Sequence, residues 1–383
     1  MRINPLEFPR RLLVVAILLT LSTFGVSCSQ TEEANLVPVE TRKPEPTSVP
    51  FETPTTQPPQ EPTPTSVPFP TPIPTPTPTN FERGELDGII RSPLNGTSVS
   101  EESLTRRIIA LKIDNHLDAR PQSGIDMADM IVEIWVEGIT RYLAVFQESD
   151  SDFVGPIRSM RPTDYSIQNS WASTFINSGG QLWIQEIGDN SNVRWFEEPP
   201  GTFRIAARSA PHNLYGDTSA LRTLDTRGDY ESPLAPLWQF GNMNEDALVA
   251  SEVKLSYWFD YTTSWYWNEE ETMYEKSTIG QPHYYLDSDN VAHRISSETL
   301  IILETLFFLT CYGCESDSRV PVAETVGNGV AWLLHDGKVL KGNWSRSSEF
   351  EWFNLTYDDG SPMLVPPGKL WMTLARRNNV TFE

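Results

Sequence analysis

Proline and threonine dominate residues 31–80, and this composition decides which part of the chain can fold around a core. The sequence TSVPF at residues 47–51 recurs at residues 65–69, and Pro-Thr dipeptides fill the stretch that ends at Asn80. Such a segment buries too little apolar surface to fold and favours extended polyproline II. We expect a spacer over residues 28–80 with a reach of roughly 150 Å. The folded domains must then lie within residues 81–383.

The N-terminus predicts the compartment. Arg2, Arg10 and Arg11 precede an apolar run over residues 12–26, which is typical of a secretory signal peptide and short for a membrane span. The run ends in GVS before Cys28, which resembles a bacterial lipobox except that Gly25 stands where Leu is usual. We predict a lipoprotein signal peptide at residues 1–27 and a lipid on Cys28. This lipid would anchor the protein to the extracytoplasmic face of the cell membrane; the alternative is an ordinary signal peptide with an incidental cysteine.

The net charge narrows the choice of partners. The chain carries a formal charge of −22, and removal of residues 1–27, whose three arginines and Glu7 sum to +2, leaves −24. So acidic a surface repels nucleic acid and disfavours broad contact with anionic lipid headgroups. We therefore expect no nucleic-acid partner.

Cys311 and Cys314 form a C-x-x-C motif. In an oxidising compartment, a tight loop that contains glycine favours a structural disulfide between them. A redox-active pair is the first alternative, but a polar loop follows where a helix should begin. A metal site is the second alternative, and further ligands near by are not evident. We predict no metal and no cofactor.

Two regions of different pattern follow the spacer. Apolar runs at residues 107–113, 131–137, 141–147 and 174–177 predict strands, and residues 163–173 after Pro162 predict a helix. This alternation indicates a mixed α/β domain over residues 81–245. Aromatic-rich strands and the hairpin signals at Asp336-Gly337 and Asp359-Gly360 predict a mainly antiparallel β domain over residues 246–383. The expected fold class is therefore α+β.

One arginine-rich region stands out in this acidic chain. Asp114-Asn115-His116 ends a predicted strand, where ligand crevices form in open α/β sheets. Arg158 and Arg161 precede the predicted helix, whose N-terminal NH groups attract carboxylate or phosphate. We predict a ligand site from these and other residues of the region: Asp114, Asn115, His116, Arg120, Glu137, Arg141, Arg158, Arg161, Arg208, His212, Asn213 and Tyr215.

Other interpretations of this region remain open. Arginines in an acidic protein commonly pair with carboxylates, so the cluster is also explained as a structural salt-bridge network through pairs such as Glu137–Arg141. A Ser–His–Asp set assembled from Ser159 or Ser209, His212 and Asp114 has no supporting spacing. Asp114, His116 and Asp118 offer oxygen and imidazole ligands, but only if a turn brings them to one face.

Several motifs resemble the YerB-like bacterial lipoproteins, a family of two consecutive domains of unknown function. The N-terminal motifs are IDNH at residues 113–116, ARPQSG at 119–124, ADMIVE at 128–133, VEGITR at 136–141, GPIRSMRP at 155–162 and APHNLY at 210–215. The C-terminal motifs are GNGVA at residues 327–331, GNW at 342–344 and PGKLW at 367–371. The chain departs in a single Gly138 where a glycine pair is usual, and in Ser345-Arg346 where Lys often stands. The resemblance implies a surface-anchored lipoprotein and supplies no activity.

We therefore expect a membrane-anchored, extracytoplasmic lipoprotein that binds a small anionic ligand, a cell-wall component or an envelope protein through the arginine-rich region. The alternative is an envelope hydrolase or transferase with Asp114, Glu137 or His212 as its base. A third interpretation is an assembly module that acts through surface contacts alone.

Overall fold

A computed structural model describes residues 89–310 and 319–383. The predicted signal peptide, Cys28, the spacer, and Cys311 and Cys314 all lie outside the described residues.

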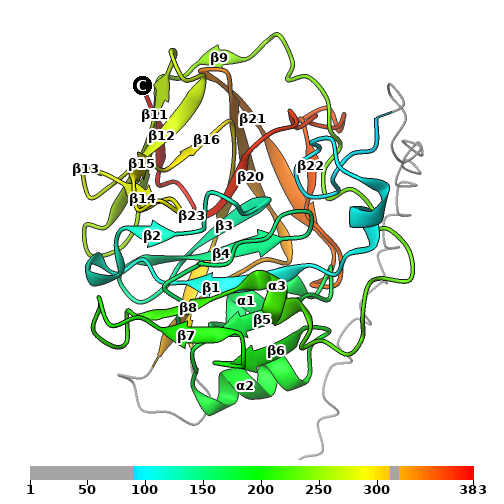
Figure 1. Ribbon diagram of the computed structural model, residues 1–383. Coiled ribbons are helices and arrows are strands. Elements are labelled where there is room, and N and C mark those ends of the chain that lie inside the picture. Colours follow the sequence, from blue (N-terminus) through cyan, green and yellow to red (C-terminus); the bar gives the residue numbers. More distant parts are fainter. Residues whose placement is uncertain (1–88, 311–318) are drawn as a thin grey trace, which may run out of the picture. The chain divides into compact units, whose positions relative to one another are not determined.

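One large sheet runs through the described chain (Figure 1). Its strand order is β22-β21-β20-β17-β23-β3-β4-β1-β5-β6, with β9 paired to β21. The bounds are β1 Ile109–Ile113, β3 Met130–Trp135, β4 Thr140–Phe146, β5 Thr174–Asn177, β6 Arg194–Glu197, β9 Leu248–Val249, β17 Thr299–Thr305, β20 Gly327–His335, β21 Lys338–Arg346, β22 Asn354–Thr356 and β23 Leu370–Arg376.

The two halves of the sequence meet inside this sheet. Strand β23 of the C-terminal half pairs in parallel with β3 of the N-terminal half, with Leu370 opposite Met130 and Leu374 opposite Ile134. On its other side β23 runs parallel to β17. Every residue of β3 and β4 is buried, as expected of strands covered on both faces. The halves therefore depend on each other for burial of their strands.

Short helices precede the parallel strands β5 and β6 of the N-terminal half. Helix α1 (Pro162–Gln168) follows β4 and leads into β5, which runs parallel to β1, and α2 (Leu182–Asp189) connects β5 to the parallel strand β6. Helix α3 (Thr218–Arg222) follows β8, and the 3-10 helices η1 (Glu101–Thr105) and η2 (Leu117–Ala119) flank β1. The polar residues that follow β1 and β5 thus come to the same edge of the sheet.

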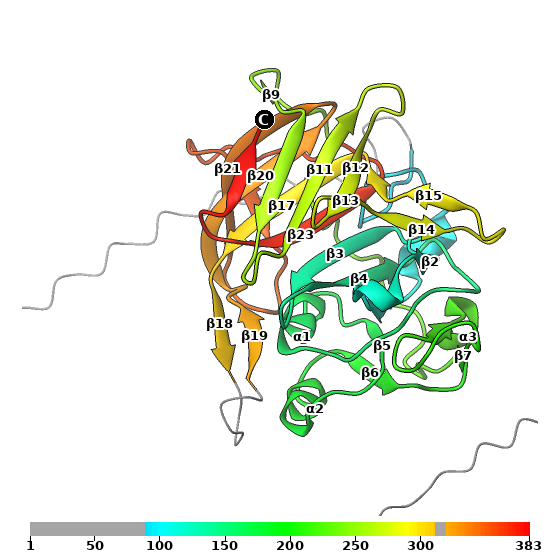
Figure 2. The same ribbon diagram turned by 90° about the vertical axis from the view of Figure 1, so that its left-hand side faces the viewer.

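A second, six-stranded sheet belongs to the C-terminal half (Figure 2). Its members are β10 Glu252–Ser256, β11 Thr262–Asn268, β12 Met273–Thr278, β13 Gln281–Pro282, β16 Ser296–Ser297 and β24 Val380–Phe382. Smaller pairings use β2 Gln122–Ser123, β14 Tyr284–Leu286, β15 Ala292–Arg294, β7 Thr202–Arg204, β8 Leu214–Gly216, β18 Phe307–Thr310 and β19 Val320–Ala323. Strand β2 pairs in parallel with β14, which is another link between the halves.

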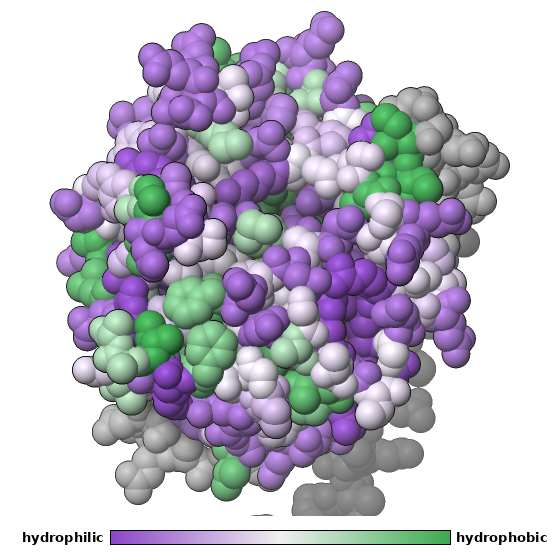
Figure 3. Space-filling view, in the orientation of Figure 1, coloured by the Kyte–Doolittle hydropathy of each residue, from purple (hydrophilic) through white to green (hydrophobic). Residues whose placement is uncertain are grey.

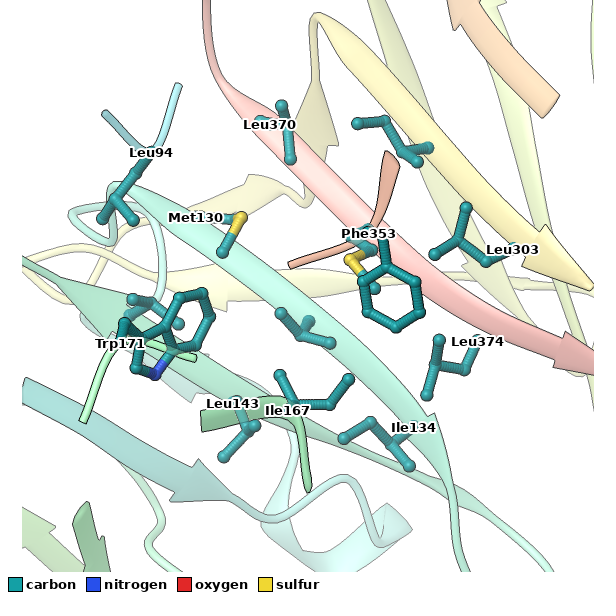
Figure 4. Packing of buried hydrophobic residues seen from close by; sticks show 14 of the residues in the cluster. Leu94, Met130, Ile134, Leu143, Ile167, Trp171, Leu303, Phe353, Leu370 and Leu374 are labelled. Atoms are coloured by element: carbon teal, nitrogen blue, oxygen red, sulfur yellow. The ribbon is translucent and has the colours of Figure 1, made fainter. Parts of the chain in front are cut away.

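The described part of the chain contains two hydrophobic cores, and each includes residues of both halves. Figure 4 shows Met130 and Ile134 of β3 beside Leu370 and Leu374 of β23, with Ile167 of α1 near by. The other core joins residues of β1 and β4 to the aromatic strands of the second sheet. Full burial of one Leu or Met contributes about 1.5–3 kcal/mol, so these shared cores join the halves strongly.

The observed fold is rich in β structure, as the sequence predicted for the C-terminal half. The division into an α/β domain and a β domain near residue 245 stays a prediction. The helix expected over residues 163–173 is shorter, because α1 ends at Gln168 and Ala172 adopts a positive φ of 48°. The predicted hairpin at Asp336-Gly337 is confirmed: both residues have positive φ and connect β20 to β21.

Candidate functional site

A buried carboxylate organises the predicted site. Asp114 follows β1 and is fully buried. One of its oxygens, Oδ1, accepts the backbone N–H of His116 at 3.0 Å. The other, Oδ2, lies 2.7 Å from His212 Nδ1 and 3.4 Å from Arg158 Nε. The structure thus brings residues almost a hundred positions apart to one carboxylate.

Two arginines beside Asp114 have unused hydrogen-bonding capacity. Arg141, on β4, is 7% exposed and donates through one guanidinium nitrogen to the carbonyl of Ser159 at 2.9 Å. Among the described residues, the Nε atoms of Arg141 and Arg158 are buried without a hydrogen-bond partner. Burial, and then the charge of Arg161, lowers the pKa of Arg141 to about 10, although Asp114 opposes this shift. These side chains form a region of positive charge that the adjacent carboxylates do not fully neutralise.

Arg161, unlike Arg141 and Arg158, forms a close ion pair, and its partner is Glu137. Its Nε and NH2 groups donate to the two carboxylate oxygens at 2.6 and 2.8 Å, which is a bidentate contact. Burial by itself raises the pKa of Glu137, but the hydrogen bonds and charge of Arg161 outweigh burial and lower the pKa. The backbone N–H of Arg161, at the start of α1, donates to Asp164 at 2.7 Å. Asp164 therefore accepts from a backbone N–H at the start of α1, where a ligand carboxylate or phosphate was expected.

Arg120 and Arg208 stabilise the loop after β1. Arg120 donates to the side-chain and backbone oxygens of Asn115, both at 3.0 Å, and to Tyr261 Oη at 3.3 Å. Arg208 donates to the carbonyls of Asp118 and Pro121 at 3.0 and 2.6 Å. Arg208 thus connects the segment that contains His212 to the loop that contains His116. The rings of these two histidines stack, with their centroids 4.8 Å apart.

Two of the predicted site residues, Asn213 and Tyr215, make their contacts away from Asp114. Asn213 accepts from Arg204 at 2.7 Å and is bonded to the backbone of Ile205. Tyr215 is buried on β8, where its ring stacks on Phe153 at 4.3 Å. These contacts pack the β7–β8 hairpin.

The structure also contains a buried polar network that the sequence did not indicate. Glu133 accepts from Lys276 at 2.6 Å, from Trp371 at 3.0 Å and from Thr140 at 2.7 Å. Glu133 and Lys276 are both fully buried. Burial lowers the pKa of Lys276, although Glu133 opposes the shift. Because two of the partners of Glu133, Lys276 and Trp371, lie 143 and 238 residues away, no local pattern could have revealed the network.

The same network reaches the predicted site through Asn115. Its amide donates to Thr140 Oγ1 and to Tyr261 Oη, each at 2.9 Å. Gln122 then connects the backbone carbonyl of Asp114 to His283 of the C-terminal half. The floor of the site is therefore built from both halves.

Among the described residues, the His212 ring makes no hydrogen bond to the hydroxyl of Ser159 or of Ser209. Ser159 donates its hydroxyl to the carbonyl of Ser178 at 2.8 Å. Ser209 contributes its backbone carbonyl, which accepts the N–H of His212 at 3.0 Å. The Asp114–His212 contact forms as a triad would require, but the hydroxyl of Ser159 is engaged by Ser178.

The family of the chain follows from comparison with known proteins. A model of the protein of unknown function (DUF3048) N-terminal domain matches residues 94–231, and its C-terminal domain model matches residues 253–372. The chain belongs to this two-domain, YerB-like family.

Two comparisons concern a particular relative. The chain is 27% identical over 300 residues to "Putative lipoprotein YerB" of Bacillus subtilis (strain 168), across 74% of this chain and 86% of that protein. A crystal structure of YerB protein from Bacillus subtilis matches with a TM-score of 0.66 and 21% identity, and covers 77% of this chain and 99% of that one. The structural likeness supports the fold alone. Within residues 89–310 and 319–383, the helices are too short or too polar to cross a bilayer.

Proposed function

We propose that this protein is a lipid-anchored, extracytoplasmic binding lipoprotein. The name of the Bacillus subtilis relative and the lipobox-like sequence before Cys28 support the anchor. A proline-rich spacer then suits a binding domain held away from the membrane. The visible face of the molecule is largely hydrophilic, as expected for a domain surrounded by water (Figure 3).

The ligand in this proposal is an anion with a carboxylate or phosphate group, held by Arg141 and Arg158. The unused Nε groups of these arginines are the observation that carries the proposal. Arginine recognises such groups through paired hydrogen bonds, and in a buried setting its charge is poorly screened. The predicted site residues include five arginines (Arg120, Arg141, Arg158, Arg161 and Arg208) and two carboxylates (Asp114 and Glu137), so this region has a formal charge of +3 in a chain of −22.

A cell-wall fragment or another envelope component fits this chemistry and location. Arg120, Arg208 and Asn115 serve in the proposal as supports of the loop, since their donors already contact backbone or neutral oxygens. Arg161 is neutralised by Glu137 and contributes less to anion binding than Arg158.

Thermal melting tests the proposal. Residues 81–383, which include all described strands, would be melted with phosphate, sulfate, dicarboxylates, nucleotides and wall fragments. We expect a saturable rise in midpoint for at least one anion, equivalent to about 2.7 kcal/mol at a hundredfold excess over Kd. The rise should disappear in an Arg141→Met/Arg158→Met variant and persist in Arg377→Met, whose exposed side chain lies elsewhere.

A rise that survives in the double variant would place the anion at another site. A flat response to every anion, together with a much lower midpoint in the double variant, would identify the cluster as a structural salt-bridge network.

A further inference from the structure

We propose that His116, Asp118 and His212 form a binding site for a divalent transition-metal ion of the zinc type. One ligand atom from each of the three side chains lies within 4.8 Å of the others. Sequence spacing did not indicate this set, because His212 comes from a loop almost a hundred residues away. The proposal goes beyond anion binding and depends on different side chains.

The local geometry approaches that of a metal site. His116 Nδ1 lies 3.5 Å from Asp118 Oδ2. In a tetrahedral site with metal–ligand distances of about 2.0–2.1 Å, two ligand atoms are roughly 3.3 Å apart. His116 and Asp118 therefore need only a small side-chain adjustment to share one ion, and both are exposed enough to make it.

Asp114 prepares His212 for this role. Because the Oδ2 atom of this buried carboxylate accepts at 2.7 Å from His212 Nδ1, the proton of a neutral imidazole is placed on Nδ1. The lone pair of Nε2 is then available to a metal. A carboxylate behind a metal-binding histidine is a common arrangement that fixes the ring and strengthens the ligand. Since Oδ1 of the same carboxylate holds the backbone of His116, Asp114 positions both histidines.

Some rearrangement accompanies binding. The two imidazole planes are nearly parallel, at 14°, so one ring must rotate before both nitrogen lone pairs converge. His116 is the ring that can move, because half of its side chain is exposed. Its Nδ1 would exchange the 3.2 Å hydrogen bond from the Asp118 N–H for the metal. Arg208 holds the loop backbone at Asp118 during this change.

The ligand types define the class of ion. Two imidazoles and one carboxylate suit zinc and similar divalent ions, whereas calcium and magnesium prefer oxygen ligands alone. Three protein ligands leave a coordination position for water or an anion. The negative charges of Asp114 and Asp118 favour the cation, and the nearby Arg158 and Arg208 oppose it.

Calorimetric titration of the purified full chain with zinc chloride tests the site. We expect one saturable site whose affinity falls at least tenfold in His116→Ala and in Asp118→Asn. These exposed residues are chosen so that both variants fold, which metal-free melting curves would verify. His293→Ala is the matched control, because His293 is also exposed and pairs with an aspartate, Asp287, at 2.7 Å.

Cysteine is the competing ligand, so a Cys311→Ser/Cys314→Ser variant is titrated in parallel and should bind as the unaltered chain does. Zinc binding that persists unchanged in both His116→Ala and Asp118→Asn would overturn the proposal, as would its loss in the cysteine variant. Absence of saturable zinc binding would overturn it as well. The anion response of Arg141 and Arg158 is measured without metal, so either proposal can fail alone.

Discussion

Two groups of charged side chains balance their charges differently. The Asp114 cluster consists of Asp114, His212, Arg141 and Arg158, and the Glu133 network consists of Glu133, Lys276, Trp371 and Thr140. Around Glu133, one buried carboxylate meets one buried ammonium, and a tryptophan and a threonine complete its hydrogen bonds. Around Asp114, arginines outnumber carboxylates, and two buried Nε groups remain without partners among the described residues. A matched network stabilises and specifies a fold, whereas surplus hydrogen-bond donors are suited to a ligand.

The largest expected effect is in the matched network. Replacement of Lys276 by Met leaves Glu133 buried without its counter-charge, and we expect a loss of about 3–5 kcal/mol in the free energy of unfolding. Urea denaturation measures this loss. The double variant Glu133→Gln/Lys276→Met should lose less than the sum of the single changes. If Lys276→Met lowers the free energy of unfolding by less than about 1 kcal/mol, Lys276 does not supply the counter-charge that Glu133 needs.

Lys112 gives the next effect, as a dependence on pH. It forms a buried pair with Asp164 at 2.6 Å, and burial lowers the pKa of Lys112 from 10.5 to about 8, against the opposing effect of Asp164. Between these two values the unfolded chain holds a proton that the folded chain has released. The free energy of unfolding should therefore rise with pH in this window, by up to about 1.4 kcal/mol per pH unit.

The Lys112 contribution is isolated by comparison with Lys112→Met at pH 7.5 and at pH 10. The difference in the free energy of unfolding between the unaltered protein and the variant removes the titration of other groups. The same substitution at the half-exposed Lys338 serves as the control. A difference that stays constant with pH would contradict the lowered pKa.

A smaller effect is expected at the rim of the Asp114 cluster. Glu137 and Arg161 form a bidentate pair with side-chain exposures of 38% and 13%, so water screens part of their attraction. A double-mutant cycle with Glu137→Gln and Arg161→Met should give a coupling of about 1 kcal/mol. A coupling energy several times larger would show that the Glu137–Arg161 pair stabilises the fold as the buried Glu133–Lys276 pair does.

The smallest effect should come from Arg158. Within the described part of the chain it forms one ion pair, with Asp114, in which Nε and Oδ2 are 3.4 Å apart, and this Nε makes no hydrogen bond there. Arg158→Met should change the free energy of unfolding by only about 0.5 kcal/mol, while it weakens anion binding. Chemical denaturation and an anion titration of the same variant separate the two roles. A large loss of stability would mean that the surplus charge is structural.

Local sequence patterns predicted much of the fold. The strand pair β3–β4, the strand β5 and the hairpin at Asp336-Gly337 follow from apolar runs and turn residues, which act within a few positions. The end of α1 was predicted too late, because tertiary packing rather than helix propensity decides where so short a helix stops.

The candidate site could be predicted only in part. Asp114 and His212 were both singled out, and the structure joins them at 2.7 Å. The partners of the remaining residues were not predictable: Arg161 pairs with Glu137, and Tyr215 packs on Phe153. Tyr261, which contacts both Asn115 and Arg120, comes from the other half of the chain.

The sequence by itself determined the acidic charge, the proline-rich composition of residues 31–80, the main strands and the residue types of an arginine-rich region, because each is a matter of composition or short-range pattern. Only the tertiary structure decided that β23 pairs with β3, that Glu133 is neutralised by Lys276, and that His116, Asp118 and His212 lie together. These contacts join residues far apart in the chain. Burial and charge pairing among such residues depend on tertiary contacts, which no short-range pattern specifies.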